Sequence, residues 1–150
     1  MAQVEGKIAT CSVDGSIKYW NLLDGAQSLK PTQDIFNEKK VVAPFRHQTS
    51  IMSVDISSNS NVIISSSRDN HVCVWRRNQS GVSDIELLYD FIPCEFTITS
   101  VRFIYQSSQG DYTFACASIS SSIFIYTFNV NSPKKTGYIT TFSFFFPFFF

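Results

Sequence analysis

The chain has 150 residues, a length that suits one domain, and its 12 basic and 12 acidic side chains leave no formal net charge. Charged residues make up 16% of the sequence, which is below the usual quarter for globular proteins. This balance argues against an electrostatic nucleic-acid binder, which would carry a basic surplus; the basic pairs are dispersed, at Lys39–Lys40, Arg76–Arg77 and Lys134–Lys135.

The first predicted element is a β-hairpin close to the N-terminus. Its two strands are Lys7–Ser12 and Ser16–Trp20, and the turn between them contains Asp14-Gly15, which is a strong hairpin signal. The segment that follows, residues 21–38, is expected to be irregular, with room for one short helical turn near Gln33–Asn37.

The middle of the chain predicts four strands. Ile51–Ile56 alternates apolar and polar side chains, as a half-buried strand does. Turn-forming residues 57–61 separate it from a second hairpin, built from Val62–Ser66 and His71–Trp75. Ile85–Phe91 has the composition of a further strand.

The last third of the chain repeats this order more weakly. Ser100–Ile104 parallels the first of the middle strands, and Tyr112–Ser118 with Ile123–Thr127 parallels their hairpin. Tyr138–Thr141 is the predicted closing strand. No segment has a sustained helical period, so the sequence predicts an all-β chain.

One pattern recurs at a fixed position in the two strongest hairpins. In each, a strand ends in Ser-x-Asp, a short turn follows, and an alternating strand ends in Trp six residues after the Asp: Asp14 with Trp20, and Asp69 with Trp75. The third hairpin has Ser120 at the Asp position and Tyr126 at the Trp position. A repeat of this size favours a stacked or radial architecture.

The pattern resembles the WD-repeat family of β-propellers. Each blade of that family is a four-stranded antiparallel sheet, lettered a to d from the axis outward, with a His before strand a, an Asp in the b–c turn and a Trp ending strand c. Arg46-His47 stands where the family has Gly-His, and Arg76 and Asn21 replace the terminal Asp of the signature. The resemblance covers Lys7 to about Thr141.

The resemblance implies a buried hydrogen-bonded chain in each blade, because polar groups removed from water need partners. In the second blade its members would be His47, Asp69, Trp75 and a serine, either Ser67 or Ser65. The other two blades are less complete. The first copy offers Asp14, Trp20 and either Ser12 or Thr10 but has no His, and the third has Cys94, Ser120 and Tyr126, so that it would lack the network.

The implied domain organisation is a partial propeller over residues 1–141, with blades at about 1–45, 46–92 and 93–141. The first blade is expected to lack strand a. Residues 142–150 form a separate Phe-rich, low-complexity tail, interpreted as a truncation or an artefact. Propellers close with four to eight blades, so three blades leave open faces, and the chain is expected to be a fragment of a larger propeller or to assemble with other chains.

No catalytic constellation, cofactor motif or metal motif is present, so the predicted function is a non-enzymatic scaffold that binds a protein or peptide. The resemblance places partners on the face formed by the d–a and b–c loops, with these candidates: Arg68, Gln48, Ser50, Val13, Thr97 and Ile119. Alternatives are a regulatory domain of a larger enzyme and a membrane-tethered propeller, although neither nucleic acid nor membrane binding is expected.

The cysteines and the N-terminus predict a cytoplasmic protein. No Cys-x-x-Cys pair is present, so the four thiols, including Cys94, are expected to be reduced. Three of them fall in predicted strands and are expected to pack as small apolar groups: Cys11, Cys73 and Cys116. The segment Met1–Lys7 is short and polar, unlike a secretory signal peptide.

Overall fold

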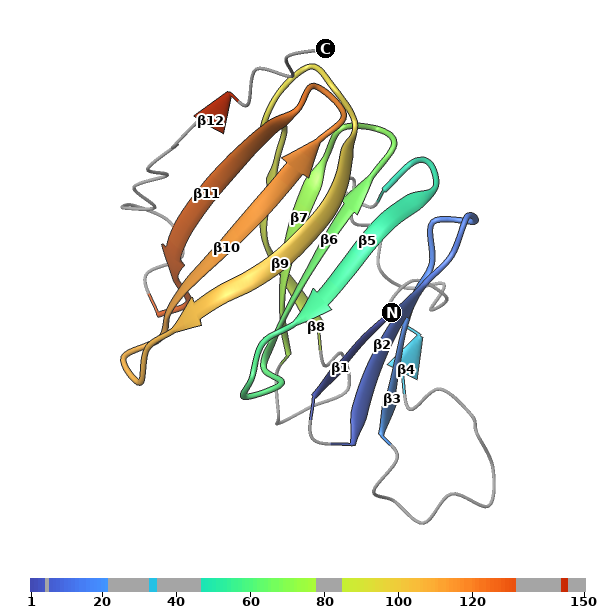
Figure 1. Ribbon diagram of the computed structural model, residues 1–150. Helices are drawn as coiled ribbons and strands as arrows, with labels where there is room; N and C mark the ends of the chain where they lie inside the picture. Colours follow the sequence, from blue (N-terminus) through green and yellow to red (C-terminus); the bar gives the residue numbers. More distant parts are fainter. Residues whose placement is uncertain (5, 22–32, 35–46, 78–84, 132–143, 146–150) are drawn as a thin grey trace.

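The computed structural model describes residues 1–4, 6–21, 33–34, 47–77, 85–131 and 144–145. These residues form twelve β-strands in three four-stranded sheets, and in each sheet consecutive strands are hydrogen-bonded neighbours. Every pairing is antiparallel, which confirms the predicted fold class (Figure 1). No helix in this part of the chain is long and apolar enough to cross a membrane. We call the sheets blade 1, blade 2 and blade 3.

Blade 1 has four strands: β1 (Ala2–Val4), β2 (Lys7–Cys11), β3 (Ile17–Asn21) and β4 (Gln33–Asp34). The prediction that this blade lacks strand a is wrong, because β1 pairs with β2 in that position. The helical turn expected near Gln33 is also wrong for Gln33–Asp34, which pair with Tyr19 and Lys18. Both strands are too short to show an alternating pattern, so their partners decide their conformation.

Blade 2 consists of β5 (Ile51–Ile56), β6 (Val62–Ser67), β7 (Val72–Arg77) and β8 (Ile85–Phe91), close to the predicted strands. All six residues of β6 are buried. A strand buried on both faces has no need to alternate, which explains the continuous apolar and small run in its sequence. Blade 2 is therefore the central layer of the described structure.

Blade 3 consists of β9 (Ile98–Gln106), β10 (Asp111–Ser118), β11 (Ser122–Asn129) and β12 (Phe144–Phe145). In β10 and β11 buried residues alternate with half-buried or exposed ones, so one face packs and the other does not. The predicted closing strand Tyr138–Thr141 lies outside the described residues. The fourth strand in this sheet is β12, from the Phe-rich segment, paired with Ser122 and Ile123.

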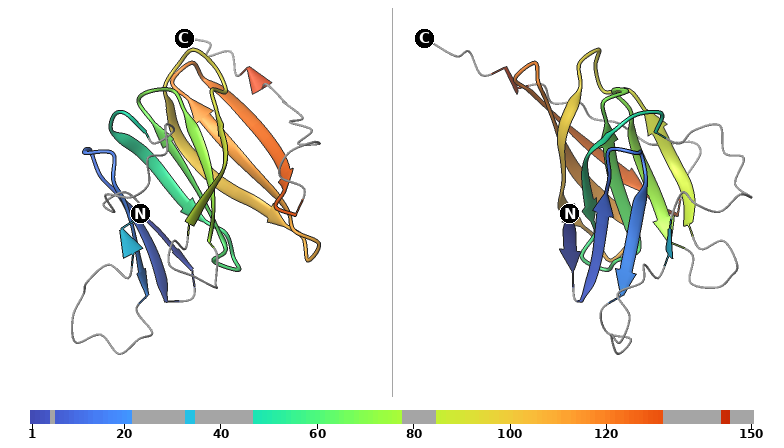
Figure 2. Two further views of the ribbon diagram at one scale, coloured as in Figure 1. Left: turned by 180° about the vertical axis from the view of Figure 1, so that it is seen from behind. Right: turned by 90° about the vertical axis from the view of Figure 1, so that its right-hand side faces the viewer.

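The blades stack face to face, with blade 1 and blade 3 on opposite sides of blade 2 (Figures 1 and 2). Two apolar clusters fill the two interfaces. One joins Ala9, Ile17 and Tyr19 of blade 1 to Ile63, Cys73 and Trp75 of blade 2. The other joins the opposite side of blade 2 to blade 3, through Val62, Ile64, Val72, Val74, Phe114, Cys116, Phe124 and Tyr126.

These contacts give each blade two distinct faces. We call the side that carries Trp20, Trp75 or Tyr126 the leading face, and the other side the trailing face. The leading face of blade 2 packs on the trailing face of blade 1, and the leading face of blade 3 packs on the trailing face of blade 2. The same two kinds of face therefore meet at both interfaces.

Polar contacts fix how the blades are stacked. The Asp55 carboxylate on β5 accepts a hydrogen bond from the backbone N–H of Phe103 on β9, at 2.8 Å. Arg76, which replaces the signature Asp, donates to the carbonyl of Val130 in blade 3 at 3.1 Å and forms an ion pair with Glu86. Such directional bonds hold the blades in one relative position.

The b–c turns have a common backbone geometry. Gly15, Asn70 and Ser121 follow the Asp-position residues of the three blades, and each has a positive φ. Glycine suits the first of these in particular, because its φ is +81° and a Cβ on Gly15 would come close to the carbonyl oxygens of His47 and Thr49, at 3.3 and 3.4 Å. The blade 1 turn thus fits against the segment that leads into blade 2.

Candidate functional site

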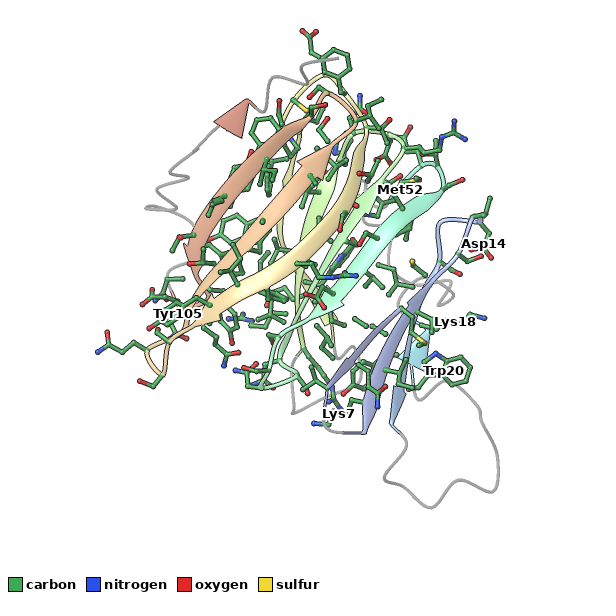
Figure 3. All side chains as sticks on the ribbon, in the orientation of Figure 1. Lys7, Asp14, Lys18, Trp20, Met52 and Tyr105 are labelled. Atoms are coloured by element: carbon green, nitrogen blue, oxygen red, sulfur yellow. The ribbon has the colours of Figure 1, made fainter. Side chains whose placement is uncertain are left out.

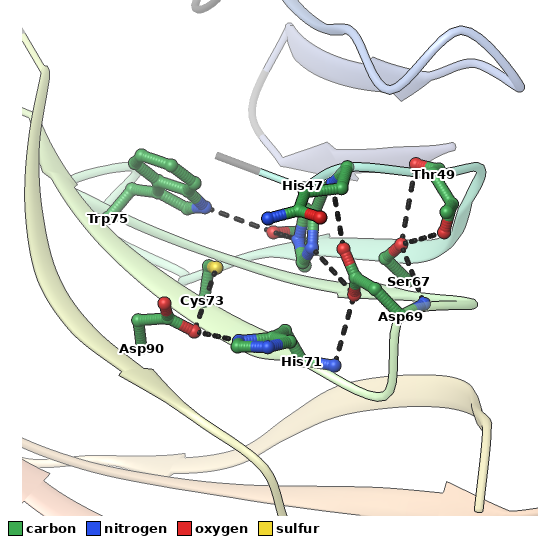
Figure 4. A network of polar contacts seen from close by, with 10 residues as sticks. His47, Thr49, Ser67, Asp69, His71, Cys73, Trp75 and Asp90 are labelled. Atoms are coloured by element: carbon green, nitrogen blue, oxygen red, sulfur yellow. Dashed lines mark hydrogen bonds and ion pairs between the residues drawn. The ribbon is translucent and has the colours of Figure 1, made fainter. Parts of the chain in front are cut away.

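A buried polar chain crosses blade 2, as the repeat pattern predicts (Figure 4). The Trp75 indole N–H donates to Ser65 Oγ at 3.0 Å, and Ser65 Oγ lies 2.8 Å from His47 Nε2. On the other side of the imidazole ring, Nδ1 lies 3.4 Å from Asp69 Oδ1. His47, Ser65 and Trp75 are all buried, and the chain provides hydrogen-bond partners for the indole N–H, Ser65 Oγ and His47 Nε2, while His47 Nδ1 makes only the longer approach to Asp69.

The contacts of this chain are compatible with a neutral histidine protonated on Nδ1. In that arrangement Ser65 Oγ accepts from the indole and donates to His47 Nε2, and the ring proton on Nδ1 faces Asp69. Burial lowers the His47 pKa below its ordinary value, more strongly than the attraction of Asp69 raises it. His47 is therefore neutral at physiological pH.

Asp69 organises the turn from the opposite end. Burial acts to raise the pKa of its carboxyl, but hydrogen bonds from the backbone N–H groups of Gln48 and His71 outweigh burial, so the pKa is lowered. One carboxylate thus holds both the segment entering β5 and the start of β7. The Asp69 carboxylate therefore has a structural role, because it binds backbone N–H groups of the turn.

Of the two candidate serines, Ser65 is the member of the chain, and Ser67 is not. Ser67 Oγ lies 3.0 Å from Thr49 Oγ1 and accepts a hydrogen bond from the Asp69 backbone N–H at 3.3 Å. It stabilises the turn, one step away from the His47–Trp75 connection.

Blade 1 shows the same division of roles. Thr10, at the position of Ser65, accepts the Trp20 indole N–H at 2.9 Å. Ser12, at the position of Ser67, is 3.5 Å from the backbone N–H of Asp14, so the expectation that Ser12 pairs with Trp20 is wrong. The Asp14 pKa is lowered by its hydrogen bonds from Ser16, within the turn.

Blade 3 replaces the polar chain with apolar packing. Cys116 and Tyr126 occupy the Ser65 and Trp75 positions and are buried in the interface with blade 2. Burial raises the pKa of both side chains, which therefore stay uncharged. Cys94, at the histidine position, lies 3.6 Å from Ser118 Oγ. In the described part of the chain all four cysteines are free thiols.

Acidification is expected to destabilise the fold, beginning below about pH 6.5, the ordinary histidine pKa. Below that value His47 binds a proton in the unfolded chain but not in the folded protein, where its pKa is lowered. Protonation therefore favours the unfolded state. One such group contributes a slope of up to about 1.4 kcal/mol per pH unit, and Asp69 adds a second loss below about pH 3.8.

Urea denaturation at a series of pH values between about 7.5 and 5 measures this slope. The His47→Gln variant is expected to be less stable but to lose the His47 part of the slope. The same series on His71→Gln is the matched control. An unchanged slope in His47→Gln would contradict the assignment.

The predicted binding residues lie at the turns and connections at one end of the blades, which we call the loop end. Figure 3 shows Asp14 and Met52 at this end and Lys7 and Tyr105 at the opposite one. Arg68 is exposed, as are Val13 (79%) and Ile119 (62%), the residues at the same turn position in the other blades. The other candidates contribute backbone: Gln48 N–H binds Asp69, and the carbonyls of Ser50 and Thr97 accept from Arg68 and Ile119.

Sequence reasoning missed the apolar part of the loop end. Ile92 and Phe96, in the connection from β8 to β9, are 55% and 51% exposed. Asn70 donates to the carbonyl of Glu95 at 2.9 Å, and Thr97 accepts from Ile119, so this connection lies between the b–c turns of blades 2 and 3. A signal was available, because two large apolar residues in a predicted loop are candidates for contact.

The second histidine also takes part in a polar contact within blade 2. His71 Nδ1 lies 2.6 Å from Asp90 Oδ1, with side-chain exposures of 37% and 15%, and so ties β8 to the start of β7. Within the described residues no group of three or more His, Cys, Asp or Glu side chains could hold a metal ion.

Comparison with known families agrees with this geometry. Residues 39–76 match the family model described as WD domain, G-beta repeat. The matched segment contains His47, Ser65, Asp69 and Trp75, the four residues of the buried chain in blade 2. No curated protein matches the chain. Residues 39–76 therefore match a WD repeat, and the three four-stranded antiparallel sheets of the described residues are consistent with blades of a partial β-propeller.

Proposed function

We propose that this protein is a non-enzymatic scaffold that binds a protein or peptide partner at its loop end. The observation that carries the proposal is a set of exposed side chains on well-anchored turns at the loop end: Val13, Arg68, Ile92, Phe96 and Ile119. Exposed apolar residues gathered around an arginine are typical of interaction sites. WD-repeat proteins commonly bind partners on this side of the propeller.

The charge of Arg68 indicates the chemistry of the partner. Its backbone N–H is held by the Ser50 carbonyl at 3.0 Å, while its guanidinium forms no hydrogen bond or ion pair within the described residues. A carboxylate beside apolar side chains would match the arginine and its neighbours. We therefore infer an acidic and apolar peptide segment as the ligand.

The polar groups inside the blades support a non-enzymatic role. His47, Asp69 and Ser65 resemble the residue types of a catalytic set, but Ser65 Oγ is bound by the Trp75 indole and His47 Nε2, and the Asp69 carboxylate by turn backbone. The buried thiols of Cys73 and Cys116 have raised pKa values, so they are protonated and unreactive. Thiols of this kind fit the cytoplasmic location that we also propose.

The Arg68→Glu variant is expected to lose partner capture by at least tenfold, because it reverses the charge at the centre of the surface. Lys7→Glu is the matched control, since it makes the same change of charge at the opposite end of the blades (Figure 3). Quantitative mass spectrometry of proteins cross-linked to immobilised wild type and to both variants measures the effect. Equal recovery on wild type and Arg68→Glu would remove the proposed surface.

We further propose that the three blades are part of a larger ring. The support is physical: a propeller sheet buries both faces against its neighbours, and four to eight blades are needed to close the ring. Blade 2 has this environment on both sides, whereas blades 1 and 3 each have it on one.

A further inference from the structure

Two blade faces are left without a neighbouring blade in the described structure. The first is the leading face of blade 1, with Ile8, Thr10, Lys18 and Trp20, which is turned away from blade 2 (Figure 3). The second is the trailing face of blade 3, with Ala115, Ala117, Ile123 and Ile125. All eight side chains are only half-buried, whereas the residues at their positions in blade 2 are buried.

These two faces are the two halves of one kind of interface. At both internal interfaces a leading face packs on a trailing face, and among the described residues one face of each kind has no blade packed on it. A single chain holds them on opposite sides of blade 2, so it cannot join them to each other (Figure 2). A second copy of the chain presents both.

The residue pairing at the interfaces selects this match. Where the leading face carries a tryptophan, Trp75, the trailing face opposite has Ala9 in the same apolar cluster. Where the leading face carries the smaller Tyr126, the corresponding residue opposite is Ile64. The open trailing face has Ala115 at this position, so it has room for the larger side chain, and the open leading face supplies Trp20.

We propose that two copies of this chain associate head to tail, with the open leading face of each on the open trailing face of the other. The result is a closed ring of six blades, within the four to eight that propellers use. Each junction would repeat the blade 1–blade 2 interface, burying Trp20 as Trp75 is buried, at 5% exposure. The inference rests on the proposed ring and names a second copy of this chain as the partner that completes it.

The test uses the full chain and two charge-introducing variants, Trp20→Glu and Ile125→Glu, one on each open face. Sedimentation velocity and light scattering are expected to give wild type at twice the 17.0 kDa chain mass and each variant as a monomer. An equimolar mixture of the variants is expected to recover dimer, because one junction between them has both faces intact. Ser108→Glu, in the exposed β9–β10 turn, is the control and should remain dimeric.

The mixture also shows that both variants are folded, since unfolded chains could not restore a dimer, and circular dichroism checks each alone. A monomeric wild type, undefined aggregates, a dimer that survives either substitution, or a mixture that stays monomeric would each overturn the proposal. Partner capture measured with Arg68→Glu is independent of these outcomes, so loss of the dimer would not remove the scaffold function.

Discussion

Replacing Ser65 with alanine is expected to lower the free energy of unfolding by about 2–4 kcal/mol. The hydroxyl is fully buried and contacts the Trp75 indole and His47 Nε2 at once. Its removal takes the acceptor from one buried group and the donor from the other, and each loss costs about 1–3 kcal/mol. Urea denaturation followed by tryptophan fluorescence and circular dichroism measures the change.

The neighbouring residue provides a control of the same size and burial. Ser66 is also fully buried, but its hydroxyl has no hydrogen-bond partner within the described residues. Ser66→Ala should therefore leave stability unchanged or raise it, by up to about 1–2 kcal/mol. Equal losses in the two variants would show that the cost comes from packing and that the Ser65 hydrogen bonds contribute little.

The Phe114→Ala substitution is expected to lower the free energy of unfolding by about 3–5 kcal/mol, the largest effect of any substitution considered. Phe114 is 1% exposed, and its ring lies 5.6–6.4 Å from those of Phe91, Phe103, Tyr126 and Phe128. Truncation would leave a cavity in the interface between blades 2 and 3, and rigid β-sheets on both sides limit how far it can collapse.

Phe96→Ala is the matched control, because Phe96 is 51% exposed at the loop end. The Phe96→Ala substitution should change the free energy of unfolding by no more than about 0.5 kcal/mol. Hydrogen exchange on Phe114→Ala should show faster opening of β10 and β11 than of β2 and β3. Similar losses for both phenylalanines would contradict the assignment of the core to this interface.

The sequence predicted the hairpins because their signals are local. Asp14-Gly15 favours a hairpin turn through the backbone preferences of these two residues alone. The spacing from Asp69 to Trp75 indicates the length of the strand between them. In the middle and last thirds, the alternation in Ile51–Ile56 and Tyr112–Ser118 was sufficient to place strands within a few residues.

The sequence could not predict features that depend on distant partners. The two-residue strands β4 and β12 are defined by pairing with β3 and β11, and so no propensity within them decides their state. Ser65 and Ser67 were equivalent candidates, because residues two apart in a strand share a face. Only the positions of His47 and Trp75 in space distinguish them.

Each sheet consists of four consecutive strands, with no crossover between sheets. Nearly all strand pairing is therefore short-range along the chain, a property that speeds folding of β-proteins otherwise slowed by distant contacts. During synthesis, a growing polypeptide can complete one sheet while the residues of the next are still inside the ribosome. Each folded sheet then presents an apolar face against which the next sheet packs. The order of translation and the order of assembly then coincide.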